Sequence, residues 1–141
     1  MPDTVYHQIF SDAFTKNVNF GSGGDAFKLA LFSSSKVVEP DDVAYSTTNE
    51  IPTAGGYTQG GYAYSNANQS ISDDDVNNRM IFDINEDASW ANSTITARYA
   101  QLYDAGYSNH LVCLFDFGAD KSSTAGTFKV VFNATGIMTI T

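Results

Sequence analysis

Apolar and polar residues alternate over several short stretches of this 141-residue chain, and polar, glycine-bearing turns separate the stretches. Alternation with a period of two is typical of strands that bury one face. Most of the bulky apolar side chains lie within residues 90–132 or close to them in the sequence. The pattern of these residues predicts three strands. Within them, residues 110–117 form a nearly continuous apolar run, which indicates a central strand buried on both faces.

Further strands are expected on either side of this region. In residues 27–32, Phe27, Leu29 and Leu31 alternate with a more mixed set of side chains, so one face is fully apolar. The other strands expected outside this region span residues 62–64 and 69–72 as a hairpin, then 80–84 and 137–140. The three strands within it are expected over residues 94–103, 110–117 and 127–132. This spacing predicts a mostly β, single-domain antiparallel β-sandwich, jelly-roll-like, with a short N-terminal helix.

The N-terminal segment has a helical period instead. Its apolar face comprises Val5, Tyr6, Ile9, Phe10, Ala13 and Phe14. Asp3 or Thr4 is expected to cap the start, and the glycines of residues 21–24 end the helix. We interpret residues 1–26 as a helix with a glycine-rich linker and residues 27–141 as the β-sandwich. The helix either plugs one side of the β core or forms an arm that reaches a neighbouring subunit.

The charge balance restricts the class of partner. Sixteen acidic residues stand against seven basic ones, which gives a net charge of −9. Binding to nucleic acid needs clustered Lys and Arg, whereas the basic residues here are scattered, and the negative charge also opposes docking on anionic membranes. We therefore expect no nucleic-acid partner and no membrane partner, and we expect a basic protein surface to be attracted.

No catalytic, cofactor-binding or metal-binding residue is predicted. The two histidines, His7 and His110, are far apart in the sequence, and with Cys113 they lack the ligand spacing of a zinc site. Cys113 lies in a predicted strand, where a buried structural thiol is expected. The chain is therefore expected not to be an enzyme.

An acidic turn partly matches a calcium-binding loop. Asp73, Asp75 and Asn77 occupy its first three ligand positions, but Asn78 replaces the turn glycine and Ile84 replaces the bidentate glutamate. A solvated acidic turn is the preferred interpretation, and a loose calcium site is the alternative.

Five residues are candidates for partner binding. Tyr45, Tyr57, Tyr62 and Tyr64 gather around the glycine-rich loop of residues 47–61, where tyrosines can serve as interface anchors, stack on sugar rings or simply cover the end of the core. Arg98 lies in the middle of a predicted strand. It is expected to pair with Asp116 or Asp83, at a sheet edge or a subunit contact.

Several motifs resemble a widespread family of small structural proteins of tailed phages. KLALFSS at residues 28–34, TNEI at 48–51 and GGYTQGG at 55–61 resemble its opening half. WANSTITAR at residues 90–98 resembles the best-marked motif of the family, and DFG at 116–118, DKSST at 120–124, Gly126 and Phe128 resemble its closing half. The chain departs from the pattern at Tyr99, where a small residue is usual, and at Phe132, where Trp is common.

This resemblance implies a virion component without enzymatic activity or cofactor. The first expectation is a capsid decoration (cement) protein, made in the host cytoplasm and located on the outer capsid surface. Its expected partners are the major capsid protein and further copies of itself, as a homodimer or homotrimer. The alternatives are a tail or head–tail connector component and a glycan-binding receptor module.

Overall fold

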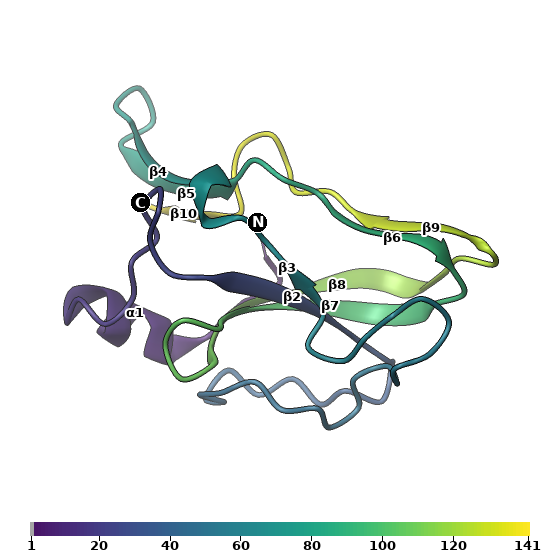
Figure 1. Ribbon diagram of the computed structural model, residues 1–141. Helices are drawn as coiled ribbons and strands as arrows, with labels where there is room; N and C mark the ends of the chain where they lie inside the picture. The colour runs from purple at the N-terminus through teal and green to yellow at the C-terminus, as the bar shows by residue number, and fades with distance from the viewer. Residues whose placement is uncertain (1) are drawn as a thin grey trace.

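The computed structural model describes residues 2–141, and it confirms a mostly β, antiparallel, sandwich-like fold with one short N-terminal helix. One layer is a five-stranded sheet with the strand order β1-β8-β7-β2-β3 (Figure 1). Its strands are β1 (Thr4–Val5), β8 (His110–Ser122), β7 (Thr96–Asp104), β2 (Phe27–Phe32) and β3 (Tyr62–Ala63).

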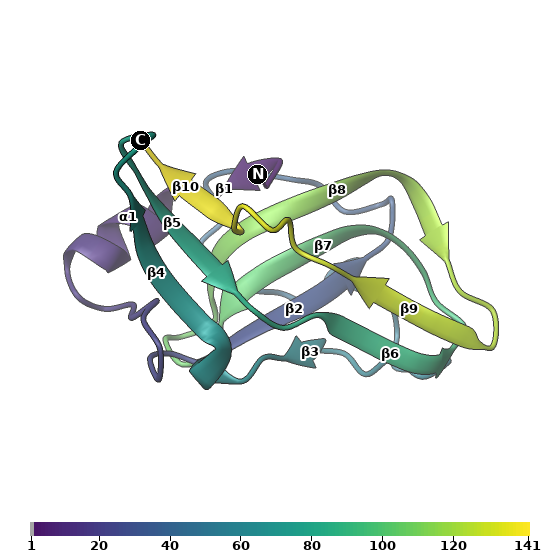
Figure 2. The same ribbon diagram turned by 90° about the horizontal axis from the view of Figure 1, so that it is seen from above.

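The second layer consists of two small sheets that follow one another end to end (Figure 2). One contains β10 (Met138–Ile140), β5 (Arg79–Ile84) and β4 (Gln69–Asp74), and the other contains β6 (Ala88–Ser93) and β9 (Gly126–Val130). The helix α1 (His7–Phe14) lies at the end of the molecule where β4, β5 and β10 are found. A 3₁₀ turn, η1 (Asn66–Asn68), carries the chain from β3 to β4.

The main core fills the space between the two layers. Phe27, Leu29 and Leu31 of β2 and Val112 of β8 belong to it, and none is measurably exposed. A smaller cluster covers the other face of the five-stranded sheet and includes Tyr6, Ala30, Phe32, Tyr103, Leu111 and Leu114. Burying an aliphatic side chain stabilises a fold by roughly 1.5–3 kcal/mol. The apolar run in β8 is thus explained by burial on both faces, as predicted.

The N-terminal segment differs from the prediction at its start. Thr4 and Val5 pair with Leu114 and Cys113 of β8 as a short edge strand, so α1 begins only at His7. Tyr6 occupies the N-cap position and its side chain makes no capping hydrogen bond. The carboxylate of Asp3 accepts a hydrogen bond from the backbone N–H of Asp116 instead of capping the helix. In this structure the segment packs on its own domain, with Tyr6 and Ile9 buried.

The predicted hairpin between residues 62–64 and 69–72 is wrong. Tyr62 of β3 pairs with Leu29 of β2, whereas β4 pairs with β5 in the other layer. The two segments therefore belong to different sheets. The strand expected over residues 94–103 begins at Thr96, because the chain crosses between the layers after β6.

Candidate functional site

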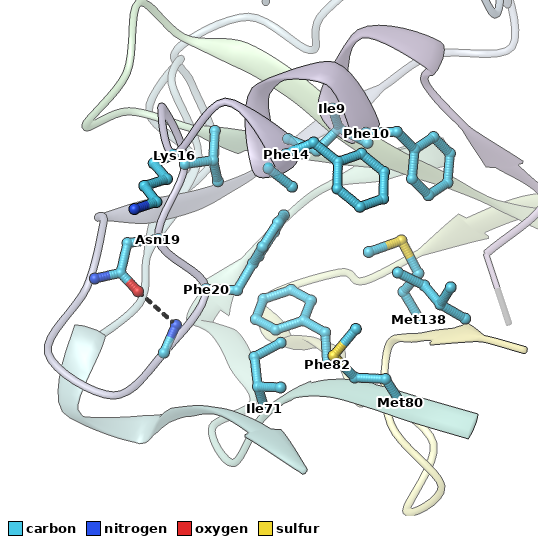
Figure 3. A pocket seen from close by; sticks show the side chains of 14 residues that line it. Ile9, Phe10, Phe14, Lys16, Asn19, Phe20, Ile71, Met80, Phe82 and Met138 are labelled. Atoms are coloured by element: carbon cyan, nitrogen blue, oxygen red, sulfur yellow. Dashed lines mark hydrogen bonds between the residues drawn. The ribbon is translucent and has the colours of Figure 1, made fainter. Parts of the chain in front are cut away.

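An apolar groove of about 600 Å³ lies between α1 and the three-stranded sheet β10-β5-β4 (Figure 3). Nine large apolar side chains are exposed in residues 2–141, and five of them line this groove. These five are Phe10, Phe14, Ile71, Met80 and Ile140. A contiguous exposed apolar surface on a small domain commonly marks a binding site.

The strand register builds the floor of the groove from two cross-strand rows. Ile71 of β4 lies opposite Phe82 of β5, which lies opposite Met138 of β10. In the next row Met80 lies between Asp73 and Ile140. Residues directly opposite one another in an antiparallel sheet share a face. Asp73 therefore lies on the groove face, beside the apolar floor.

The other face of this sheet is mostly polar. It carries Ser70, Ser72, Asp74, Arg79 and Asp83, which alternate with the groove residues. The Arg79 Nε atom lies 2.8 Å from Asp74 Oδ2. Hydrogen bonds from Asn77 and Arg79 lower the pKa of the Asp74 carboxyl. The alternation places Ile71, Met80 and Phe82 toward α1 and most of the charged residues of β4 and β5 on the other face, with Asp73 as the exception.

Helix α1 forms the wall of the groove, and a buried polar contact fixes it. Asp12 is 2% exposed, and its Oδ2 atom lies 2.6 Å from Nδ1 of His110 at the start of β8. Gln8 donates a hydrogen bond of 3.0 Å to the other carboxylate oxygen. Ile9 is buried on the same domain, which leaves Phe10 and Phe14 on the open side.

The segment after α1 closes the inner end of the groove. The ring of Phe20 stacks on Phe27 with centroids 5.3 Å apart and contacts Phe82 at 4.6 Å. Gln69 Nε2 donates to the carbonyl oxygens of Asn19 and Gly21, which ties this segment to the start of β4. In the described chain, Lys16 is the charged residue that lines the groove.

The four candidate tyrosines do not form one surface. Tyr57 and Tyr64 are 2% and 5% exposed, and Tyr45 and Tyr62 are half-buried. Their rings lie in the core or pack at its edge, and the ring of Tyr45 stacks on Tyr103 at 4.3 Å. Of the three interpretations of these tyrosines, the structure favours coverage of the core for Tyr57 and Tyr64.

Hydrogen bonds to Glu50 hold the side chains of Tyr45 and Tyr57 against the domain. The Glu50 carboxylate accepts hydrogen bonds from the hydroxyls of Tyr45 and Tyr57 and, at 2.7 Å, from the backbone N–H of Gly60. The Tyr57 hydroxyl in turn accepts one from the backbone N–H of Leu31. Burial and the hydrogen bond to Glu50 raise the pKa of Tyr57. The network fastens the glycine-rich loop onto β2.

Glu86 has a similar role for the segment that follows that loop. It accepts hydrogen bonds from the Tyr62 hydroxyl at 2.8 Å and from the backbone N–H of Ser65 at 2.8 Å. Gly61, between the two networks, has φ +77°, and a Cβ atom there would lie 2.0 Å from the Leu29 carbonyl oxygen. Only glycine fits this approach.

Arg98 pairs with Asp116, which was one of its two expected partners. The contact is bidentate, with Nε 2.5 Å from Oδ1 and the second nitrogen 3.0 Å from Oδ2. It joins β7 to β8 within one chain. The guanidinium lowers the pKa of the Asp116 carboxyl. The side chains of Arg98 and Asp116 are 27% and 29% exposed.

The histidines and the cysteine do not come together. His7 contacts Asp41 at 3.0 Å on the exposed side of α1, whereas His110 contacts the buried Asp12. Cys113 is buried, and burial raises the pKa of its thiol. Within residues 2–141, no group of three or more His, Cys, Asp or Glu side chains is placed to hold a metal ion.

Sequence reasoning missed the groove because its residues come from three separate segments. The one available signal was the breadth of the apolar face of α1, which includes Phe10 and Phe14 in addition to Ile9. Across the described part of the chain, no helix is long and apolar enough to cross a membrane. Comparison with protein-family models, curated proteins and solved structures gave no match.

Proposed function

We propose that this chain is a non-enzymatic structural protein of a tailed-phage virion, and specifically a capsid decoration (cement) protein that binds and stabilises the shell of the major capsid protein. The observation that carries this proposal is the exposed apolar groove on an acidic β domain. A surface of this kind binds another macromolecule by shape and burial of apolar area, without a cofactor.

The rest of the domain is compatible with a passive binding role. Several polar side chains are engaged inside the domain: Glu50 holds the glycine-rich loop, Glu86 holds the segment after it, and Arg98 joins two strands. Such contacts hold the domain itself in shape. The family-like motifs at residues 28–34 and 90–98 supply the assignment to a virion.

The same groove is compatible with a tail or head–tail connector role, and the copy number in the virion separates the possibilities. Purified virions are analysed by quantitative protein staining, with the major capsid protein as the internal reference. A ratio that approaches one copy per capsid subunit supports decoration. A few copies per particle would assign the chain to the tail or connector, and absence from the virion would overturn the proposal.

A further inference from the structure

We infer that the groove receives an apolar segment flanked by Lys or Arg, supplied by a different protein. The inference rests on the proposed function, because it describes the chemistry of the partner surface that such a protein would bind. Three features carry it: the free apolar surface of the groove, the charge beside it and the unsuitability of a second copy as the occupant.

The groove has unoccupied apolar surface on both sides. On α1, Phe14 is 85% exposed and Phe10 is 37% exposed. On the floor, Ile71, Met80 and Ile140 are each about 40% exposed, with values of 42%, 39% and 41%. The volume of about 600 Å³ lies within the range of sites that enclose a sizeable ligand. Met80 and Met138 add a floor that can adapt to the shape of an inserted side chain.

The sheet that forms the floor is acidic. The β4–β5 hairpin, residues 69–84, carries four aspartates against one arginine. Asp74, which is paired with that arginine, and Asp83 lie on the face away from the groove. Asp73 lies on the groove face beside Met80, and Asp75 follows in the turn. Basic residues that flank an apolar insert would therefore meet carboxylates beside Met80 and the β4–β5 turn. Lys16, which lines the groove after α1, would repel a basic flank there, so the attraction is confined to the β4–β5 end. The net charge of −9 acts in the same direction at longer range.

A second copy of the chain fits the groove poorly. In a two-fold symmetric contact whose axis passes through the groove, each groove would face its own equivalent. The acidic hairpins would then lie close together, and the two chains would carry the same net charge of −9. The acidic hairpin would attract a basic partner, whereas it would repel the acidic hairpin of a second copy. Self-association through another surface is unaffected by this argument.

Two synthetic peptides with the same apolar core test the inference, one flanked by lysines and one by glutamates. Isothermal titration measures their affinity for the purified full chain, and amide NMR shifts locate the contact. The lysine-flanked peptide is expected to bind about tenfold more tightly at low ionic strength, and salt should reduce this difference. The shifted amides should lie in α1, β4, β5 and β10.

Matched variants identify the groove as the site. Phe14→Ser is expected to weaken binding about tenfold, because it removes a large apolar contact. Val76→Ser is the control, since Val76 is 90% exposed and lies outside the groove lining. Asp73→Lys should remove the preference for lysine flanks, whereas Asp120→Lys changes the net charge equally at an exposed position on β8 and should preserve it.

Three results would overturn the inference: no binding of either peptide, equal binding of both, or self-association that Phe14→Ser abolishes. The last would make a second copy the occupant. These results are independent of the virion copy number. A chain that is abundant in virions but ignores both peptides contradicts only this inference. A chain that binds the lysine-flanked peptide but is absent from virions contradicts only the proposed function.

Discussion

The Nδ1 atom of His110 lies 2.6 Å from the Oδ2 atom of Asp12, and this contact joins the start of β8 to the middle of α1. The Asp12 side chain is 3% exposed and that of His110 is 17% exposed. The wall of the groove is therefore fixed by a polar contact under the helix as well as by Ile9.

Replacement of Asp12 by Ala is expected to destabilise the protein by about 1–3 kcal/mol, because it leaves the His110 ring nitrogen and the Gln8 amide without their carboxylate partner. Urea unfolding measures the loss. Asp41→Ala is the control, since the His7–Asp41 contact is exposed and should add little. Equal effects of the two substitutions would show that the buried contact does not secure α1.

Replacement of Glu50 by Ala is expected to cost about 2–4 kcal/mol, because the hydroxyls of Tyr45 and Tyr57 and the Gly60 N–H lose their common acceptor. Glu50→Gln should cost less, since its carbonyl oxygen can still accept from Tyr57 and Gly60. Urea unfolding of both variants, with amide exchange of residues 47–61, tests this. Equal losses would mean that the carboxylate charge, and not its acceptor geometry, holds the loop.

The burial of the Asp104 carboxyl leads us to expect a specific dependence of protein stability on pH. Asp104 is fully buried, and burial, with the nearby Asp25 carboxyl, raises its pKa to about 6 from an ordinary value near 3.8. Between these values the folded state binds more protons than the unfolded state, so stability falls as pH rises through this window. A shift of this size corresponds to about 2–3 kcal/mol.

The isosteric Asp104→Asn substitution tests that dependence. The Asn carbonyl oxygen can still accept hydrogen bonds from the backbone N–H groups of Gly106 and Tyr107. We expect the fall in the free energy of unfolding between pH 4 and 6 to become smaller by about 2 kcal/mol in this variant. Urea unfolding across that pH range measures it. Asp120→Asn, at an exposed position, should leave the profile unchanged. An unaltered decline in Asp104→Asn would assign it to other groups.

Arg98→Ala should lower the melting temperature slightly, because the pair with Asp116 is partly exposed and screened by water. Arg98→Lys should restore only part of this loss, since lysine lacks the bidentate fork. Thermal unfolding compares the two variants, and sedimentation reports their assembly. A change in assembly without a change in melting temperature would show that Arg98 acts at a subunit contact.

The sequence predicted those features that depend on local pattern. The alternation in residues 27–32 and the apolar run in residues 110–117 correspond to β2 and to the buried half of β8. Which strands pair with one another could not be predicted from local pattern. Tyr62 pairs with Leu29, and Thr4 with Leu114, through contacts between distant segments that local periodicity does not encode.

The candidate site shows the same division. The Arg98–Asp116 pair was among the expected alternatives, because the guanidinium fork of an arginine suits contact with a carboxylate. The orientation of Tyr57 was not predictable, since its position depends on Glu50 and on the Leu31 N–H. The groove depends on the joint placement of α1, β4, β5 and β10, which no single stretch of sequence reveals.

The most direct test of the account is the binding of the purified protein to capsid shells that lack it. Co-sedimentation across a range of protein concentrations gives the affinity and the number of sites for the wild type, Phe14→Ser and Val76→Ser. We predict saturable binding of the wild type and of Val76→Ser, with binding of Phe14→Ser weakened about tenfold. Undiminished binding of Phe14→Ser would contradict the groove as the docking surface, and failure of all three proteins to bind would contradict the decoration function.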